Sequence, residues 1–172
     1  MPITIRSETR LDAAGIHDVV AAAFGRPAEA DLVDRLRARE RTVLSLVAVD
    51  AGAIVGHVLF TPVALSGHPE VRCVGLAPLA VTPSRQRQGI GAALVAARLD
   101  GCRRLARDSV VVIGDPAYYG RFGFARGSRF EIGNTFGVPD EAFMVLELRP
   151  GALAGKRGLA RYDAAFDEPG DR

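Results

Sequence analysis

The sequence predicts one α/β domain in which helices pack against a mixed central β-sheet. The hydrophobic period switches repeatedly along the chain between the 3.6-residue repeat of helices and the two-residue repeat of strands. A length of 172 residues is enough for one domain with a substantial core. Hydrophobic residues make up 48% of the chain and charged residues 24%, which is the composition of a globular protein.

Charge and hydropathy argue against two classes of partner. The formal net charge is only +2, and the basic residues are scattered along the chain. A nucleic-acid binder needs a dense basic surface, so neither DNA nor RNA is expected. The N-terminal segment MPITIRSETR lacks the apolar region of a signal peptide, and polar residues and glycines interrupt the most apolar stretch, residues 43–65. We therefore expect neither export nor membrane insertion.

The cysteines and histidines give no sign of a metal site. The chain contains two cysteines, Cys73 and Cys102, and no CxxC motif. Both are expected to be buried, reduced thiols, which favours a cytoplasmic location. The histidines, His17, His57 and His68, lie far apart in the sequence, without cysteine or acidic residues at ligand spacing. We therefore expect that no metal is bound.

The first half of the chain predicts a strand, two helices and a hairpin. Residues 3–9 alternate apolar and polar, as strands do. Two amphipathic helices follow, over residues 11–24 and 30–40. Residues 42–50 and 53–65 have the period of strands and are separated by a short turn, so they predict a hairpin. The apolar face of the first helix is expected to contain Leu11, Ile16, Val19, Val20 and Phe24.

A proline marks the strand that comes next, over residues 71–81. Since proline cannot donate a hydrogen bond to a sheet, this strand should part from one neighbour near Pro78. Residues 89–106 then predict a long helix. Its inner side is expected to contain Ile90, Ala93, Leu94, Ala97 and Gly101, with Arg98, Arg103 and Arg104 on its other sides.

The last third predicts short elements. Residues 109–115 form an apolar, β-branched run typical of a strand that is covered on both faces. Asp115 and Pro116 are good helix-start residues, so a short helix is expected over 116–124. Two further strands are predicted, over residues 143–149 and 158–166.

The segment RQRQGIG, residues 85–91, stands at the start of the long helix. A helix N-terminus attracts anions, and glycines let a phosphate approach the backbone. A P-loop is excluded because no Lys-Ser/Thr pair follows the glycines, and a dinucleotide fingerprint is weak because Leu94 stands where Gly or Ala is needed. A helix that uses glycine only for tight packing remains an alternative.

The whole order of elements resembles the GNAT superfamily of acyl-CoA-dependent N-acyltransferases, over roughly residues 3–148. The pyrophosphate loop of that family, Gln/Arg-x-x-Gly-x-Gly/Ala, is matched by Gln86, Gly89 and Gly91. The segment LAPLAV precedes this loop and YYGRFGF follows it later, and the combination is far more specific than either piece alone. The resemblance implies a twisted, mixed, mostly antiparallel sheet that is splayed in the middle, with helices on both faces. It implies one N-acetyltransferase domain over residues 1–172, with 149–172 as a C-terminal extension.

The resemblance also implies where acetyl-CoA, the co-substrate, would bind. The pantetheine arm would bond to the strand backbone at Leu79, Ala80 and Val81, and an N–H such as that of Val81 would stabilise the oxyanion. Backbone amides would hold the pyrophosphate, with Arg85 and Arg87 near the ribose phosphate or in solvent. The residues of that loop are Arg87, Gln88, Gly89, Ile90, Gly91 and Ala92.

Tyr119 matches the family's tyrosine four residues before a Gly-Phe pair, which implies the general acid that protonates the departing thiolate. A tyrosine pKa near 10 against a thiol pKa near 8.5 makes full transfer uphill by about 2 kcal/mol. Asp115 stands where relatives often have Asn, so its role stays open. No general base is assigned.

The acceptor is expected to be a primary amine of an unidentified small molecule or protein. In such folds the turn between the first two helices and the late hairpin flank the acceptor, so Phe24, Arg26 and Phe136 are candidate contacts. Capping of the core, or exposure to water, is an equal alternative for them. A non-catalytic acyl-CoA sensor of the same fold is the rival function, and either a monomer or a homodimer is compatible with the sequence.

Overall fold

The computed structural model describes residues 2–168. This part of the chain divides into two compact units. Unit 1 comprises residues 2–61, 77–101 and 164–168, and unit 2 comprises residues 62–76 and 102–163. Strands β3 and β4 each contribute residues to both units.

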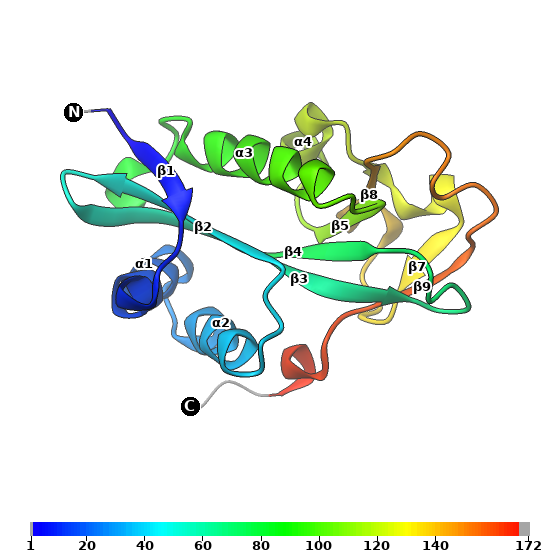
Figure 1. Ribbon diagram of the computed structural model, residues 1–172, viewed down its shortest axis with the longest axis horizontal. Coiled ribbons are helices and arrows are strands. Elements are labelled where there is room, and N and C mark those ends of the chain that lie inside the picture. The colour runs from blue at the N-terminus through cyan, green and yellow to red at the C-terminus, as the bar shows by residue number, and fades with distance from the viewer. Residues whose placement is uncertain (1, 169–172) are drawn as a thin grey trace. The chain divides into compact units, whose positions relative to one another are not determined.

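Unit 1 contains the N-terminal helices, a hairpin and most of the long helix. In Figure 1, α1 and α2 lie on one face of the β2–β3 hairpin and α3 lies on the other. A core cluster of α1, α2, β2 and β3 side chains also takes in Ala80 of β4 and Ala165 of the C-terminal segment. The elements are β1 (Thr4–Ser7), the 3-10 turn η1 (Arg10–Asp12), α1 (Ala13–Phe24), α2 (Ala28–Ala38), β2 (Leu44–Asp50), β3 (Ala53–Leu65), β4 (Cys73–Val81), η2 (Pro83–Arg85), α3 (Ile90–Arg104) and η6 (Ala164–Asp167).

A β-bulge in the hairpin lets Ile54 and Gly56 of β3 face opposite sides of the sheet. Ala48 pairs with Gly56, whereas Val49 pairs with Ile54, so β3 has one extra residue here. Ile54 packs against Gly15 of α1, where an added Cβ would lie 3.0 Å from Ile54 Cδ1. Gly56 instead faces α3, where a Cβ would lie 3.0 Å from a Leu94 methyl carbon. The missing side chain therefore lets α3 approach the sheet closely.

Unit 2 contains the second half of the sheet around its own core. β5 runs parallel to β4 and antiparallel to β8, β6 pairs with β8, and β9 pairs with β3 and β7. Phe143, Val145 and Val111 are fully buried in this core. The remaining elements are β5 (Ser109–Ile113), α4 (Pro116–Tyr119), η3 (Gly120–Phe122), β6 (Ala125–Arg126), η4 (Gly127–Phe130), β7 (Ile132–Asn134), η5 (Asp140–Ala142), β8 (Phe143–Glu147) and β9 (Gly158–Arg161).

The strand order β1-β2-β3-β4-β5-β8-β6 makes a mixed sheet in which most neighbours are antiparallel. The predicted mixed α/β fold is confirmed. The short strands β6 and β7 were not predicted, because two or three residues are too few to show a period. The predicted extension after residue 148 contributes β9 to unit 2 and η6 to unit 1.

Several side chains point elsewhere than the helical patterns predict. Leu11 is 94% exposed because it lies in η1, before α1 begins at Ala13. Phe24, the last residue of α1, is also largely exposed. On α3 the prediction for two positions was wrong. Ala93 is exposed, whereas Arg98 is buried with its guanidinium over the ring of Phe60.

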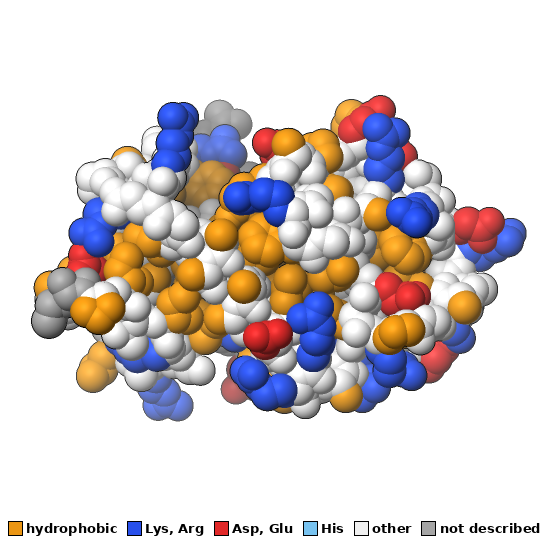
Figure 2. Space-filling model, turned by 90° about the horizontal axis from the view of Figure 1, so that it is seen from above, with side chains coloured by type: hydrophobic (Ala, Val, Ile, Leu, Met, Phe, Trp, Pro, Cys, Tyr) orange, Lys and Arg blue, Asp and Glu red, His pale blue; other side chains and the backbone are white. Residues whose placement is uncertain are grey.

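Surface charge, the two cysteines and the apolar character of the helices can each be described from the structure. On the face drawn in Figure 2, Lys and Arg side chains stand apart from one another among hydrophobic and neutral surface. Cys73 and Cys102 are both buried and unpaired. Within residues 2–168, no helix combines the length and the apolar character that a bilayer crossing needs.

Candidate functional site

Strand β4 separates from β5 part-way along its length. The parallel ladder joins Cys73, Val74 and Gly75 to Ser109, Val110 and Val111. Gly75 and Val111 form the last β4–β5 pair. Among the described residues, no further pair joins the two strands beyond it. β5 continues in its pairing with β8 through Ile113, and β4 continues to Val81. The predicted break near Pro78 is confirmed, beginning a few residues earlier.

The loop after β4 presents open backbone at the start of α3. Arg87 (φ 60°) and Gly89 (φ 82°) both have left-handed backbone, the conformation that tight turns use. The first helical bond runs from Ala93 N to Gly89 O at 3.0 Å. The N–H groups of Ile90, Gly91 and Ala92 precede this bond and are the donors that a helix start leaves for an anion. No atom lies within 4 Å of a Cβ added at Gly89, so the space beside it is open.

The loop's polar side chains hold its shape. Gln86 Nε2 donates to the Val81 carbonyl at 3.0 Å, and Gln88 Nε2 donates to the Ser84 carbonyl at 3.3 Å. The guanidinium of Arg85 pairs with Asp50 at the hairpin turn, 2.5 Å away. Arg87 is exposed. Of the two arginines, Arg87 is therefore the one that remains available for a phosphate.

In unit 2, Tyr119 is held by α4 and by its aromatic neighbours. Asp115 caps this helix, because its Oδ1 accepts from Ala117 N at 2.8 Å. The Tyr119 ring meets Tyr118 and Phe124 edge-on, with centroid distances of 5.0 and 5.7 Å. It also covers Gly114, where an added Cβ would lie 2.5 Å from the ring. A single orientation of the phenol follows from these contacts.

The phenol of Tyr119 is protonated at neutral pH. Its pKa is raised well above the usual value, first by burial and then by the neighbouring Tyr118. No hydrogen bond joins its hydroxyl to another residue within 2–168. The group can therefore donate to an incoming acceptor, but full proton transfer is harder than an ordinary tyrosine pKa implies.

Two of the three candidate acceptor contacts belong to unit 1 and the third belongs to unit 2. Phe24 and Arg26 lie at the turn between α1 and α2, where the Arg26 guanidinium is paired with Glu29. Phe136 belongs to unit 2 and packs edge-on against Tyr162, with ring centroids 5.3 Å apart. Tyr162 lies in the C-terminal extension and was not predicted, because a lone tyrosine after a short strand carries no local signal.

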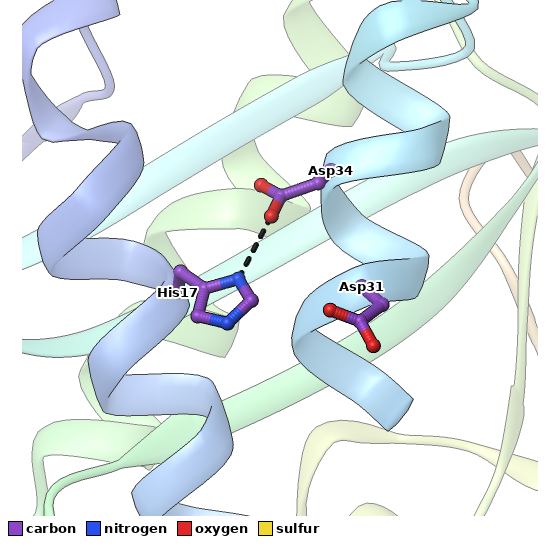
Figure 3. Close-up of side chains that lie close together, drawn as sticks. All are labelled: His17, Asp31 and Asp34. Carbon is purple, nitrogen blue, oxygen red and sulfur yellow. Dashed lines mark hydrogen bonds and ion pairs between the residues drawn. The ribbon is translucent and has the colours of Figure 1, made fainter. Parts of the chain in front are cut away.

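A second cluster also escaped the sequence analysis. His17 of α1 lies beside Asp31 and Asp34 of α2, and their ligand atoms are all within 4.8 Å of one another (Figure 3). His17 Nδ1 is 2.8 Å from Asp34 Oδ2, and Arg37 binds the other oxygen of Asp34 at 2.7 Å. The sequence analysis looked only for acidic residues at ligand spacing along the chain, and such spacing does not show side chains that two helices bring together.

Comparison with known proteins decides the family. The sequence profile described as Acetyltransferase (GNAT) domain matches residues 4–127. The chain belongs to the GNAT acetyltransferase family. It is therefore an acyltransferase, and the matched GNAT segment includes both the loop before α3 and Tyr119.

Two GNAT relatives are similar over nearly the whole chain. The Escherichia coli K12 protein named Uncharacterized N-acetyltransferase YhbS is 38% identical over 164 residues, covering 95% of this chain and 98% of YhbS. The crystal structure of E. coli YhbS in complex with CoA matches with a TM-score of 0.93 and 37% identity, covering 96% of this chain and 92% of the other. A GNAT family acetyltransferase from Brucella melitensis, in complex with acetyl-CoA, matches with a TM-score of 0.82 and 35% identity, covering 96% and 99%.

Proposed function

We propose that the chain transfers an acetyl group from acetyl-CoA to a primary amine. The observation that carries this is the end of the β4–β5 ladder at Gly75 and Val111, beyond which β4 continues to Val81 and into the loop that opens α3. A strand edge without a partner offers backbone groups to an extended amide-containing arm. Two similar GNAT structures contain CoA or acetyl-CoA, which supports the same ligand here.

The proposed roles follow the order of β4 and the loop. Backbone groups of Leu79, Ala80 and Val81 bind the pantetheine arm and stabilise the oxyanion. The amides from Arg87 to Ala92 hold the pyrophosphate, because the loop contains two residues with left-handed backbone and the helix start leaves N–H groups without helical partners. The exposed Arg87 side chain adds positive charge.

The reaction is direct attack in a ternary complex. The neutral amine nitrogen forms a bond to the thioester carbonyl carbon, and a tetrahedral oxyanion results. Its collapse breaks the carbon–sulfur bond, the amine loses one proton to water, and the sulfur gains one from water. Because the pKa of Tyr119 is raised, its main contribution is a hydrogen bond that strengthens as charge develops on sulfur.

The experiment measures binding and turnover separately. Calorimetry with acetyl-CoA tests binding, and release of free thiol against a panel of amines tests transfer. Tyr119→Phe keeps the ring contacts, so it should leave acetyl-CoA affinity unchanged and lower kcat by roughly 10²-fold. Tyr118→Phe is the matched control and should retain turnover. If acetyl-CoA binds but no amine supports thiol release, the sensor function replaces the transferase.

A further inference from the structure

We propose that Gly114 is a positioning residue for acetyl transfer, because its missing side chain determines where the Tyr119 phenol lies. The inference rests on the proposed function, in which this phenol donates a hydrogen bond to the departing sulfur. Gly114 stands between the end of β5 and the start of α4. All the residues that carry the argument belong to unit 2.

The backbone of Gly114 does not itself require glycine. Its φ lies outside the left-handed range, whereas Gly123 in the same unit has a φ of +93°. Such a backbone is open to residues with a side chain, so the reason for glycine is space. A Cβ added at Gly114 would lie 2.5 Å from Tyr119 Cε2 and 3.0 Å from Cδ2, and the three atoms nearest to it all belong to the Tyr119 ring. The phenol therefore occupies the room that glycine leaves.

The backbone on both sides of Gly114 is anchored. Gly114 N donates to the Ala142 carbonyl oxygen at 2.9 Å, which continues the pairing of β5 with β8. On the other side, the Asp115 carbonyl oxygen accepts from Tyr119 N at 3.0 Å, and the Asp115 side chain caps α4. A side chain at position 114 would therefore displace the ring of Tyr119 more readily than the strand.

The displacement is large enough to affect catalysis. Ordinary contact between carbon atoms begins near 3.4 Å, so the ring would have to move by roughly 1 Å. Within residues 2–168 no hydrogen bond holds the Tyr119 hydroxyl, so the packing of the ring sets its position. A hydrogen bond to sulfur depends on its length and angle, and a misplacement of about 1 Å can lower a rate by about 10²-fold.

The test measures kcat and acetyl-CoA affinity separately for Gly114→Ala. The kcat for thiol release should fall at least about tenfold, whereas the Kd for acetyl-CoA from calorimetry should change less than about threefold. The decisive comparison adds Gly114→Ala to Tyr119→Phe. Because no hydroxyl is left to misplace, the kcat of the double variant should stay within about threefold of Tyr119→Phe. General damage to the fold would instead lower it by the same further tenfold.

Two controls separate positioning from the added methyl group and from lost stability. Gly120→Ala adds a methyl group beside Tyr119 in the chain, where nothing lies within 4 Å of the added Cβ, and should keep the wild-type kcat. Asp108→Asn changes a buried carboxylate immediately before β5 and is expected to lower stability. It should nevertheless keep the wild-type kcat at a temperature where it is folded.

If Gly114→Ala fails to fold, solution NMR of the wild type replaces it. Nuclear Overhauser contacts between the Hα protons of Gly114 and the ring protons of Tyr119 are expected, together with a single χ1 rotamer for Tyr119. Absence of these contacts, or a second populated rotamer, overturns the proposal.

The outcomes distinguish this inference from the proposed function. A folded Gly114→Ala variant that keeps the wild-type kcat overturns the positioning role, as does a loss that multiplies the loss in Tyr119→Phe. Wild type that releases no thiol with any amine instead overturns the proposed function, and the role of Gly114 falls with it. A Tyr119→Phe variant with wild-type kcat removes the phenol from the reaction, and this role as well.

Discussion

The Nε2 atom of His57 lies 2.8 Å from the hydroxyl oxygen of Ser45, at a position in unit 1 where the imidazole is fully buried. Glu8 is close to both, with Oε2 3.5 Å from the same nitrogen and hydrogen-bonded to the Ser45 hydroxyl. Arg37 donates to the other oxygen of Glu8 at 2.8 Å. Arg98 is the further charged group that acts on the imidazole. The cluster joins β2, β3, α2 and the residue that follows β1 through hydrogen bonds and ion pairs.

Stability should fall as the pH drops below about 6.5 because of His57. Burial lowers the pKa of this imidazole, and the attraction of Glu8 does not offset it. The unfolded chain therefore binds a proton that the folded protein does not, and the contribution is fully present only above the unfolded pKa near 6.5. The slope approaches 1.4 kcal/mol per pH unit at most. Urea unfolding between pH 7.5 and 5 measures it.

Substitutions of two histidines test whether His57 causes this dependence of stability on pH. His57→Gln should flatten the dependence between pH 6.5 and 5, whatever its effect at pH 7.5. His68→Gln removes a histidine that lies in unit 2 and should keep the wild-type slope. Below pH 4.5 Glu8 adds a second loss. Burial would raise its pKa, but hydrogen bonds from His57, Arg37 and Ser45 lower it to about 2. Equal slopes in wild type and His57→Gln would contradict the prediction.

Gly89→Ala should weaken acetyl-CoA binding by at least about tenfold. Its loss of stability should be no larger than that of the same substitution at another glycine with a positive φ. The φ of +82° disfavours any side chain, by about 1 kcal/mol, although the space is open. Gly67 at the β3–β4 turn has a φ of +77° and equally open surroundings, so Gly67→Ala is a matched control. Thermal unfolding should show similar losses for both variants. Calorimetry should show weaker binding only for Gly89→Ala, and equal affinities would place the phosphate elsewhere.

Local features explain what the sequence predicted well. Gly89 acts through its left-handed φ, and Pro78 acts through its missing N–H. Both effects belong to the residue's own backbone, so they can be predicted without knowing the fold. Asp115 caps α4 for the same reason. The mixed sheet followed from the alternation of periods, which each element carries by itself.

Contacts between residues far apart in the chain explain the features that the sequence did not predict. Tyr162 meets Val111 across 51 positions, and His57 contacts Ser45 of β2 and Glu8, which follows β1. The inward position of Arg98 on α3 contradicted the helical pattern, since a charged residue is ordinarily placed outside. Such contacts depend on which elements pack together, and no local spacing specifies that.

Asp108→Asn should destabilise the protein by about 2 kcal/mol. Its buried carboxylate accepts from Arg149 at 2.6 Å and from the Arg72 backbone N–H at 2.8 Å, at the beginning of β5. Burial would raise its pKa, but these hydrogen bonds keep it below the usual value, so the stabilisation is lost as the pH falls through the acid range. Asp140→Asn changes an exposed acceptor of Ser128 and should cost less than about 1 kcal/mol. Denaturant unfolding at pH 7 compares the two, and equal losses would contradict this account.

Neither native thiol should react with a disulfide reagent until the protein unfolds. Cys73 and Cys102 are buried, and burial raises the pKa of Cys73 to about 11, so the reactive thiolate is scarce at pH 8. Leu105→Cys adds a thiol where the native side chain is 47% exposed and should be modified within the mixing time of a spectrophotometric assay. Full modification of both native cysteines requires denaturant. Rapid loss of one native thiol would show that unit 2 opens around Cys73, which sits two residues before Gly75 and the ring of Tyr162.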